Sequence, residues 1–273
     1  RIHSGGTFVF GSTTLANTKV RITPVAAAAT NVWIEAIELP DPAPAMIALT
    51  FDDASVSFMT VLRPILERYG VRATFNINTG DVGTNDALYV TSAQVRQLSA
   101  DGHQITCHNV SNLKYTASPY SGDQTLSQYM ADYTTARKTL EGYGLPADGF
   151  MYHSYVRGGV DEALVVELKS EGVRCARLAA QPKIVQYGAG IGAEVMALRT
   201  YELGTNYATS IVVDGVNDLA QYGGLMMIMA HEIITSGTPT GVQVLASDLE
   251  TVLSRAKAYG IEGFCYYHYW FGG

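Results

Sequence analysis

Two short polar segments of this chain carry residue types that can bind a metal ion and activate water. Asp52 and Asp53 end an apolar run, and His108 and Asn112 stand four residues apart after another apolar run. Two adjacent carboxylates repel each other, so burying both calls for a cation beside them. If the chain turns sharply after Asp53, the two carboxylates point in different directions and can take different roles. His108 and Asn112 share one face if a helical turn starts between them.

Asp53, His108 and Asn112 together offer a carboxylate, an imidazole and an amide oxygen. Three protein ligands with open positions are typical of a hydrolytic metal site, where the bound water has a pKa of about 7. Zn²⁺ suits this set best, with Co²⁺ or Ni²⁺ as alternatives. Asp52 is then free to act as the general base, and His231 would protonate the leaving group from the opposite side of the pocket.

The apolar runs belong to a regular alternation of strand-like and helix-like patterns that starts near Pro44. Eight strands are predicted, at 45–51, 72–77, 103–108, 149–153, 173–178, 194–200, 225–231 and 261–268. Helices are predicted to end at Gly70, Gly102, Gly172 and Gly260. This alternation predicts an α/β fold in which parallel strands close into a (β/α) barrel, with an open doubly wound sheet as the alternative.

Barrel enzymes build their sites from the C-terminal ends of the strands. In this chain the predicted strand ends carry polar and ionisable residues, namely Asp52, Asp53, His108, Tyr152, His153, Arg177 and His231. A backbone N–H near Tyr152 would help to stabilise a tetrahedral oxyanion. Tyr115 and Tyr120 follow the second polar segment and are expected near the substrate. His103 faces away from His108 on the same strand, so we expect it to be either a structural residue or a surface residue.

The first 44 residues do not share this alternation. Residues 19–23 and 31–39 resemble two strands, and a Pro-rich linker follows them. Two strands are not stable alone, so residues 1–44 are predicted to be the remainder of a preceding β module, or strands that pack on the barrel or on a neighbouring chain. The predicted division is 1–44 and 45–273, with a homo-oligomer or a larger modular assembly formed through the N-terminal segment.

The composition excludes several classes of function. The chain has 273 residues, 47% hydrophobic and 16% charged, which is typical of a globular protein. Its net charge of −7, without a Lys/Arg-rich block, argues against a nucleic-acid partner. No apolar run approaches the roughly 20 residues of a membrane span. Cys107, Cys175 and Cys265 are too widely spaced for a disulfide framework or a zinc ribbon and are predicted to be small buried residues.

Three motifs resemble those of the polysaccharide deacetylases of the NodB-homology type: TFDD at 50–53, HNVSN at 108–112 and MAHEI at 229–233. The resemblance implies a distorted (β/α) barrel with seven or eight parallel strands. It also implies that Asp52 is the base, that Asp53, His108 and Asn112 bind the metal, and that His231 is the general acid. The implied activity is that of a metal-dependent carbohydrate esterase, which hydrolyses N- or O-linked acetyl groups of a polysaccharide.

The chain departs from the family pattern in its second and third motifs. Asn109 replaces the usual Ser or Thr, and Asn112 stands where a second His is common, so metal affinity is expected to be modest. In the third motif, FMYHSY at 150–155, His153 occupies the position of a Pro and is either a pocket group or a packing residue. Met151 stands where many members carry an Arg beside the base. Arg177 or Arg199 is the predicted substitute for that cation.

These departures leave two other functions open. The first is a catalytically weak or inactive carbohydrate-binding or receptor-recognition protein on the same barrel. The second is an amidohydrolase that acts on a small non-sugar amide. The N-terminal strands point to an extracellular protein, whether secreted, on a cell surface or attached to a virion.

Overall fold

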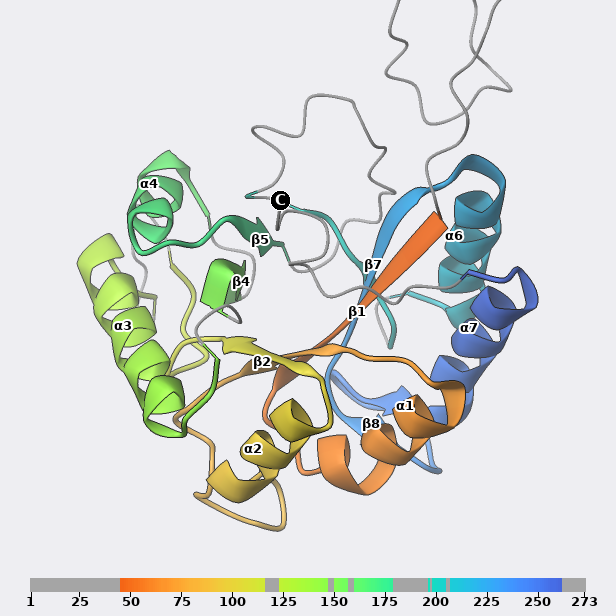
Figure 1. The fold of residues 1–273 in the computed structure, drawn as a ribbon, viewed down its shortest axis with the longest axis horizontal. Coiled ribbons are helices and arrows are strands. Elements are labelled where there is room, and N and C mark those ends of the chain that lie inside the picture. Colours follow the sequence, from red (N-terminus) through yellow and green to blue (C-terminus); the bar gives the residue numbers. More distant parts are fainter. Residues whose placement is uncertain are drawn as a thin grey trace, which may run out of the picture.

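The computed structural model describes residues 45–115, 123–146, 150–156, 160–178, 196, 198–204 and 207–261. Strands and helices alternate along this part of the chain (Figure 1). The first half runs β1 (Ala45–Asp53), a π-helical turn η2 (Phe58–Leu62), α1 (Arg63–Tyr69), β2 (Thr74–Ile77), α2 (Ser92–Ala100), β3 (Gln104–Cys107) and α3 (Leu126–Gly142). The second half runs β4 (Tyr152–Ser154), α4 (Glu162–Ser170), β5 (Cys175–Arg177), β6 (Tyr201–Glu202), α6 (Thr209–Tyr222), β7 (Gly224–Ala230), β8 (Ile233–Ile234), β9 (Val244–Leu245) and α7 (Ala246–Ala258).

The main sheet has the strand order β5-β4-β3-β2-β1-β7-β6, and its described pairs are parallel. One short segment joins the two edges of this sheet. Leu198 forms a parallel bridge with Arg177 at the end of β5, while β6, three residues later, pairs with β7. The helices lie around the outside of the strands (Figure 1). The predicted parallel barrel is therefore confirmed, with seven strands in the described part.

The strand boundaries differ most from the prediction in two places. The sixth strand was expected at 194–200, but β6 covers only Tyr201–Glu202, because this stretch bridges one sheet edge at Leu198 before pairing with the other. The strand expected at 149–153 begins at Tyr152. The strand expected at 261–268 lies outside the described residues, apart from Ile261. Residues 1–44 also lie outside them, so the domain division stays a prediction.

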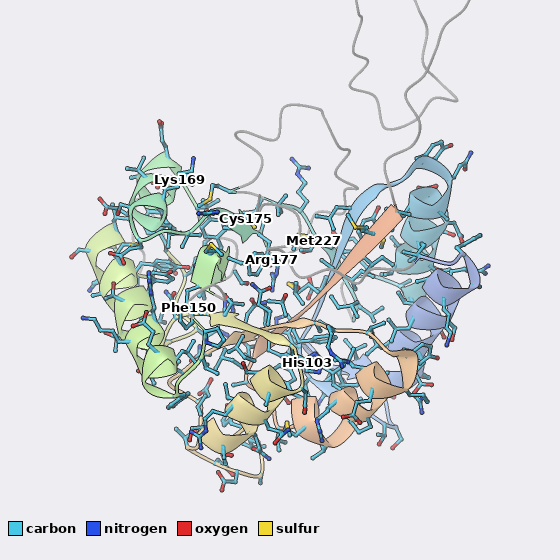
Figure 2. All side chains as sticks on the ribbon, viewed as in Figure 1. His103, Phe150, Lys169, Cys175, Arg177 and Met227 are labelled. Atoms are coloured by element: carbon cyan, nitrogen blue, oxygen red, sulfur yellow. The ribbon has the colours of Figure 1, made fainter. Side chains whose placement is uncertain are left out.

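Alternate residues of the strands pack into two separate apolar clusters. On β1, Ile47, Leu49 and Phe51 belong to a large cluster between the strands and the surrounding helices. Ala48 faces the other way and belongs to a small cluster inside the ring of strands, which it shares with Tyr152, Cys175, Leu198, Leu225 and Met227. In Figure 2, Cys175, Arg177 and Met227 lie inside the ring of helices, whereas Lys169 lies on α4 at its outer side.

Local sequence signals account for the helix ends. Thr91 begins α2 and Thr125 begins α3, each with a capping box closed by the Gln three residues later. The four glycines predicted at helix ends all have positive φ, for example 68° at Gly70, a conformation that side chains other than Gly rarely adopt.

The described part of the chain agrees with two further expectations. None of its helices is long and apolar enough to cross a membrane. Cys107 and Cys175 are buried, as predicted, and they form no disulfide within the described residues, whereas Cys265 lies outside them.

Candidate active site

The candidate site is centred on Asp52, whose side chain lies inside the barrel at the C-terminal end of β1. It follows Ala48 and Thr50 on the inner face of β1 and is only 2% exposed. Asp52 pairs in register with Asn76 on β2, and Asn76 Nδ2 donates a hydrogen bond of 2.7 Å to Asp52 Oδ1. Arg177 Nη2, from the end of β5, donates to the same oxygen. Both lone pairs of Oδ1 are therefore engaged, whereas Oδ2 accepts one longer hydrogen bond, of 3.5 Å, from the Ser154 hydroxyl.

Arg177 keeps the buried Asp52 carboxylate ionised. Burial by itself raises the pKa of Asp52, but the Arg177 guanidinium, followed by His108 and His231, outweighs burial and holds that pKa well below its ordinary value. The pKa of Arg177 changes in the opposite direction: burial lowers it, whereas Asp52 and then Tyr152 raise it above its ordinary value. The pair is thus a full salt bridge inside the barrel, where the side chain of Arg177 is completely buried.

The backbone turns sharply at Asp53, as expected if Asp52 and Asp53 are to take different roles. Asp53 has a φ of 81° and Ala54 a φ of 113°, both in the left-handed region that residues other than Gly rarely adopt. The turn directs the Asp53 side chain, which is 27% exposed, away from that of Asp52. The two carboxylates nevertheless approach the same atom, because Asp52 Oδ2 and Asp53 Oδ1 each lie 3.8 Å from His108 Nε2.

The hydrogen bond of His108 fixes which ring nitrogen faces the carboxylates. Nδ1 lies 2.9 Å from the carbonyl oxygen of Ser154. A carbonyl can only accept, so Nδ1 carries the proton, and the neutral ring has its lone pair on Nε2. Metal-binding histidines are commonly held in this way, with the second nitrogen donating to a backbone carbonyl.

His231 reaches Asp52 from a different strand end. It directly follows β7, and its Nε2 lies 3.9 Å from Asp52 Oδ2. Its Nδ1 is buried, and no hydrogen-bond partner for this atom is found among the described residues. Asp52 Oδ2 therefore faces one imidazole from β3 and another from β7.

Asp53 and His108 fit a metal ion. Two ligands at about 2.1 Å in a tetrahedral site are about 3.4 Å apart, close to the 3.8 Å between Asp53 Oδ1 and His108 Nε2. In the part of the chain that the structure describes, no group of three or more His, Cys, Asp or Glu side chains forms a metal site. Among the described residues, a third protein ligand would therefore be of another type, such as the Asn112 amide. Asn112 is exposed, and no contact among the described residues joins it to His108, so its role stays a prediction.

Two other predicted site residues, Tyr152 and Tyr115, have buried side chains. Tyr152 points into the barrel, where its hydroxyl interacts with Arg177 below Asp52, and burial raises its pKa well above the ordinary value. Tyr115 is buried and donates a hydrogen bond of 2.5 Å to Asp161 at the start of α4. Arg199 is exposed, so of the two candidate cations only Arg177 pairs with Asp52.

His153, the middle residue of β4, is a packing residue in the structure. Its Nε2 lies 2.8 Å from the hydroxyl of Tyr129, and its ring makes edge contacts with Tyr129, Tyr133 and Tyr155. Burial lowers its pKa to about 3, so the ring is neutral. His103 is also structural, as predicted: it is buried, and its Nδ1 accepts a hydrogen bond from the Ala73 backbone N–H.

Sequence reasoning missed two contributors to the site. Asn76 is the hydrogen-bond donor to Asp52, and Ser154 supplies the carbonyl that orients His108. A polar Asn inside the otherwise apolar run at 74–77 was the available signal for the first. The second acts through its backbone carbonyl, and its hydroxyl also donates a hydrogen bond of 3.5 Å to Asp52 Oδ2.

A curled sheet of seven parallel strands, with an Asp–Asp–His cluster and a second His at its C-terminal strand ends, defines an enzyme-like α/β barrel. Residues 40–142 match the family model for polysaccharide deacetylase, and residues 246–273 match one for glycosyltransferase WbsX. The resemblance carried by the first two motifs is thereby confirmed over residues 40–142, whereas the third motif, at 229–233, lies outside the matched region.

Two curated relatives and one solved structure show the same relationship. A chitin deacetylase of Pestalotiopsis sp is 30% identical over 99 residues, which cover 36% of this chain and 31% of that protein. A chitin deacetylase of Colletotrichum lindemuthianum is 37% identical over 65 residues, 24% of this chain and 26% of that protein. The matches therefore span less than a third of those relatives. The solved structure of the chitin deacetylase from Colletotrichum lindemuthianum covers 80% of this chain and 84% of its own, with a TM-score of 0.52 at 16% identity, and has the same fold.

Proposed function

We propose that this chain hydrolyses N- or O-linked acetyl groups of a polysaccharide at the Asp52 site, with a divalent metal ion, Zn²⁺ in the first place. The observation that carries the proposal is the buried, ionised Asp52, which Arg177 and Asn76 hold by one oxygen while the other faces His108 and His231. The region that matches the family model contains both the Asp52–Asp53 pair and the 108–112 motif. The relatives named chitin deacetylases support an acetylated glycan as the substrate, which agrees with an extracellular location.

The metal would be held by Asp53, His108 and Asn112, and when bound it would act as a Lewis acid that polarises the acetyl carbonyl and lowers the pKa of water. Asp52 Oδ2 takes the proton of the attacking water, because Oδ1 is already engaged by two donors. The water oxygen forms the new bond to the carbonyl carbon, and the bond from that carbon to the sugar nitrogen or oxygen breaks. His231 gives its Nε2 proton to the departing sugar atom, and acetate is released. A backbone N–H near Tyr152 is the proposed oxyanion donor.

Acetate release tests the proposal directly. Purified protein is incubated with N-acetylglucosamine oligomers and with O-acetylated glycans, before and after treatment with a chelator, and then with added Zn²⁺, Co²⁺ or Ni²⁺. We expect activity that disappears with the chelator and returns with one of the metals. Asp52→Asn should lower kcat by about 10²- to 10⁴-fold, the usual contribution of general acid–base catalysis.

Two results would contradict the proposal. Acetate release that is unchanged by the chelator would exclude the metal-dependent mechanism. Glycan binding without acetate release, in protein that contains one metal ion per chain, would instead favour the non-catalytic carbohydrate-binding protein.

A further inference from the structure

The loop that carries the proposed ligand Asn112 is held by the neighbouring loop. The backbone N–H of Thr79 donates to Asn109 O at 3.1 Å, and that of Gly80 donates to Val110 O at 2.9 Å. Asn109 has a φ of 63°, a left-handed conformation that Asn tolerates better than most residues. These bonds continue the β2–β3 pairing beyond the strand ends and fix the backbone up to Val110.

A carboxylate on α3 then holds the next residue of the loop. Asp132 Oδ2 accepts a hydrogen bond from the Ser111 backbone N–H at 3.1 Å and a second one from Ser111 Oγ at 2.8 Å. Because both bonds end on one oxygen, they fix the peptide plane and the side-chain rotamer of Ser111 together. Hydrogen bonds to an ionised acceptor are about twice as strong as those between neutral groups.

Asn112 and Leu113 are the next two residues, and both are exposed. The hydrogen bonds of the loop resume directly after them, where the Gln124 backbone N–H donates to Lys114 O at 2.8 Å. The described contacts therefore hold the loop on both sides of Asn112 and leave its amide available for a ligand. Ser111 is only half-buried and Leu113 is exposed, so the Asp132 contact contributes little to core packing.

We propose that Asp132 is a positioning residue for the metal site: by fixing Ser111, it orients Asn112 toward the ion that Asp53 and His108 would hold. This inference rests on the proposed function, because it requires the metal. Asp132 lies on a different element, α3, 20 positions beyond Asn112, and the described contacts join it to none of the three proposed ligands. Groups that orient metal ligands in this way typically contribute 10- to 100-fold to metal affinity.

The test is the Zn²⁺ dissociation constant of the purified chain, measured by competition with a chromophoric chelator, together with the melting temperature of the metal-free protein. Asp132→Ala should weaken Zn²⁺ binding about 10- to 100-fold. Asp132→Asn should recover most of that loss, because an amide oxygen can accept the same two bonds. Ser111→Ala, which removes only the hydroxyl bond, should lie between the wild type and Asp132→Ala.

Asp101→Ala is the matched control. Asp101 also accepts two side-chain hydrogen bonds, from Arg63 Nε at 2.5 Å and Gln97 Nε2 at 2.8 Å, but it lies at the C-terminal end of α2, before β3 begins. It should leave the Zn²⁺ affinity within about twofold of the wild type. The inference is wrong if Asp132→Ala binds Zn²⁺ as the wild type does, or if Asp101→Ala weakens binding equally. Absence of stoichiometric Zn²⁺ binding by the wild type would instead contradict the proposed function.

Discussion

At the scale of single residues, the barrel explains how a cation missing from one strand can be supplied by another. Met151 stands where the related motif carries an Arg, yet Asp52 is not left without a positive partner. The C-terminal ends of parallel strands converge, and Ser154 at the end of β4 is paired in register with Arg177 at the end of β5. A side chain one strand further round the ring therefore reaches the same carboxylate.

Replacing Arg177 should destabilise the protein and impair the proposed reaction. Arg177→Met leaves the buried Asp52 carboxylate without its main counter-charge, and breaking a buried ion pair in this way costs about 3–5 kcal/mol of unfolding free energy. Arg177→Lys keeps a charge but loses the planar fork, so its loss should be smaller. Urea denaturation and the rate of acetate release measure the two effects.

Arg199→Met is the control for this prediction, because Arg199 is exposed and is the other cation considered for the same role. Its unfolding free energy should stay within about 0.5 kcal/mol of the wild type. An Arg177→Met variant that retains both full stability and full activity, while Asp52→Asn is inactive, would show that Arg177 does not support the base.

The residues of the candidate site were predictable to different degrees. Asp52, Asp53, His108 and His231 could be found because each is an ionisable residue at the end of an apolar run, and parallel strands bring such ends together. Asn76 could not be assigned, because its contact with Asp52 depends on the register of β1 against β2.

At the scale of elements, the loops after β2 and β3 approach so closely that Gly80 is required. A Cβ at Gly80 would lie 2.4 Å from the carbonyl oxygen of Val110, which is the acceptor of the Gly80 N–H itself. A side chain at this position would force the two loops apart. The motif loop would then lose one of the contacts that hold it next to Asp53.

Gly80→Ala should lower the unfolding free energy by about 1–3 kcal/mol, the usual cost of inserting an atom into a tightly packed place. Gly142→Ala provides the comparison, because Gly142 lies in the last turn of α3 with open space around its Cβ position. There the better helix propensity of Ala should stabilise the protein by up to about 1 kcal/mol. Equal effects of the two substitutions in urea denaturation would show that the close approach is not maintained.

Most elements followed from the hydrophobic periodicity, and the exceptions have a physical cause. Apolar residues at helical spacing from Phe58 to Leu66 favour a helix before Gly70, but its initial turn is π-helical, which the spacing does not reveal. β6 is shorter and later than predicted, because the stretch from Leu198 to Glu202 serves both edges of the sheet. Such a closure is a property of the whole ring and leaves no local pattern.

At the scale of the whole molecule, the two ends of the barrel have different tasks. The residues of the candidate site lie at the C-terminal strand ends, whereas residues at the opposite end contribute to the stability of the fold. His103 lies at that opposite end, directly before β3, and packs edge-on against Phe75 with a ring separation of 5.2 Å. Its Nδ1 must stay unprotonated to accept the 3.2 Å hydrogen bond from Ala73 N–H.

His103 should therefore make the stability of the whole protein depend on pH. Burial lowers the pKa of His103 to about 4, with Arg72 and Arg63 acting in the same direction and Asp101 opposing them. In the unfolded chain this pKa is about 6.5, so the stabilisation is fully present above pH 6.5 and is lost as the pH falls toward 4.

His103→Asn keeps an acceptor for Ala73 N–H but cannot titrate. The loss of unfolding free energy between pH 7 and pH 4.5 in urea denaturation should be about 2 kcal/mol smaller in this variant than in the wild type. Acetate release at pH 7 should be unchanged, because His103 and Asp52 lie at opposite ends of the strands. Identical pH dependence of the unfolding free energy in the two proteins would show that His103 is not the titrating group.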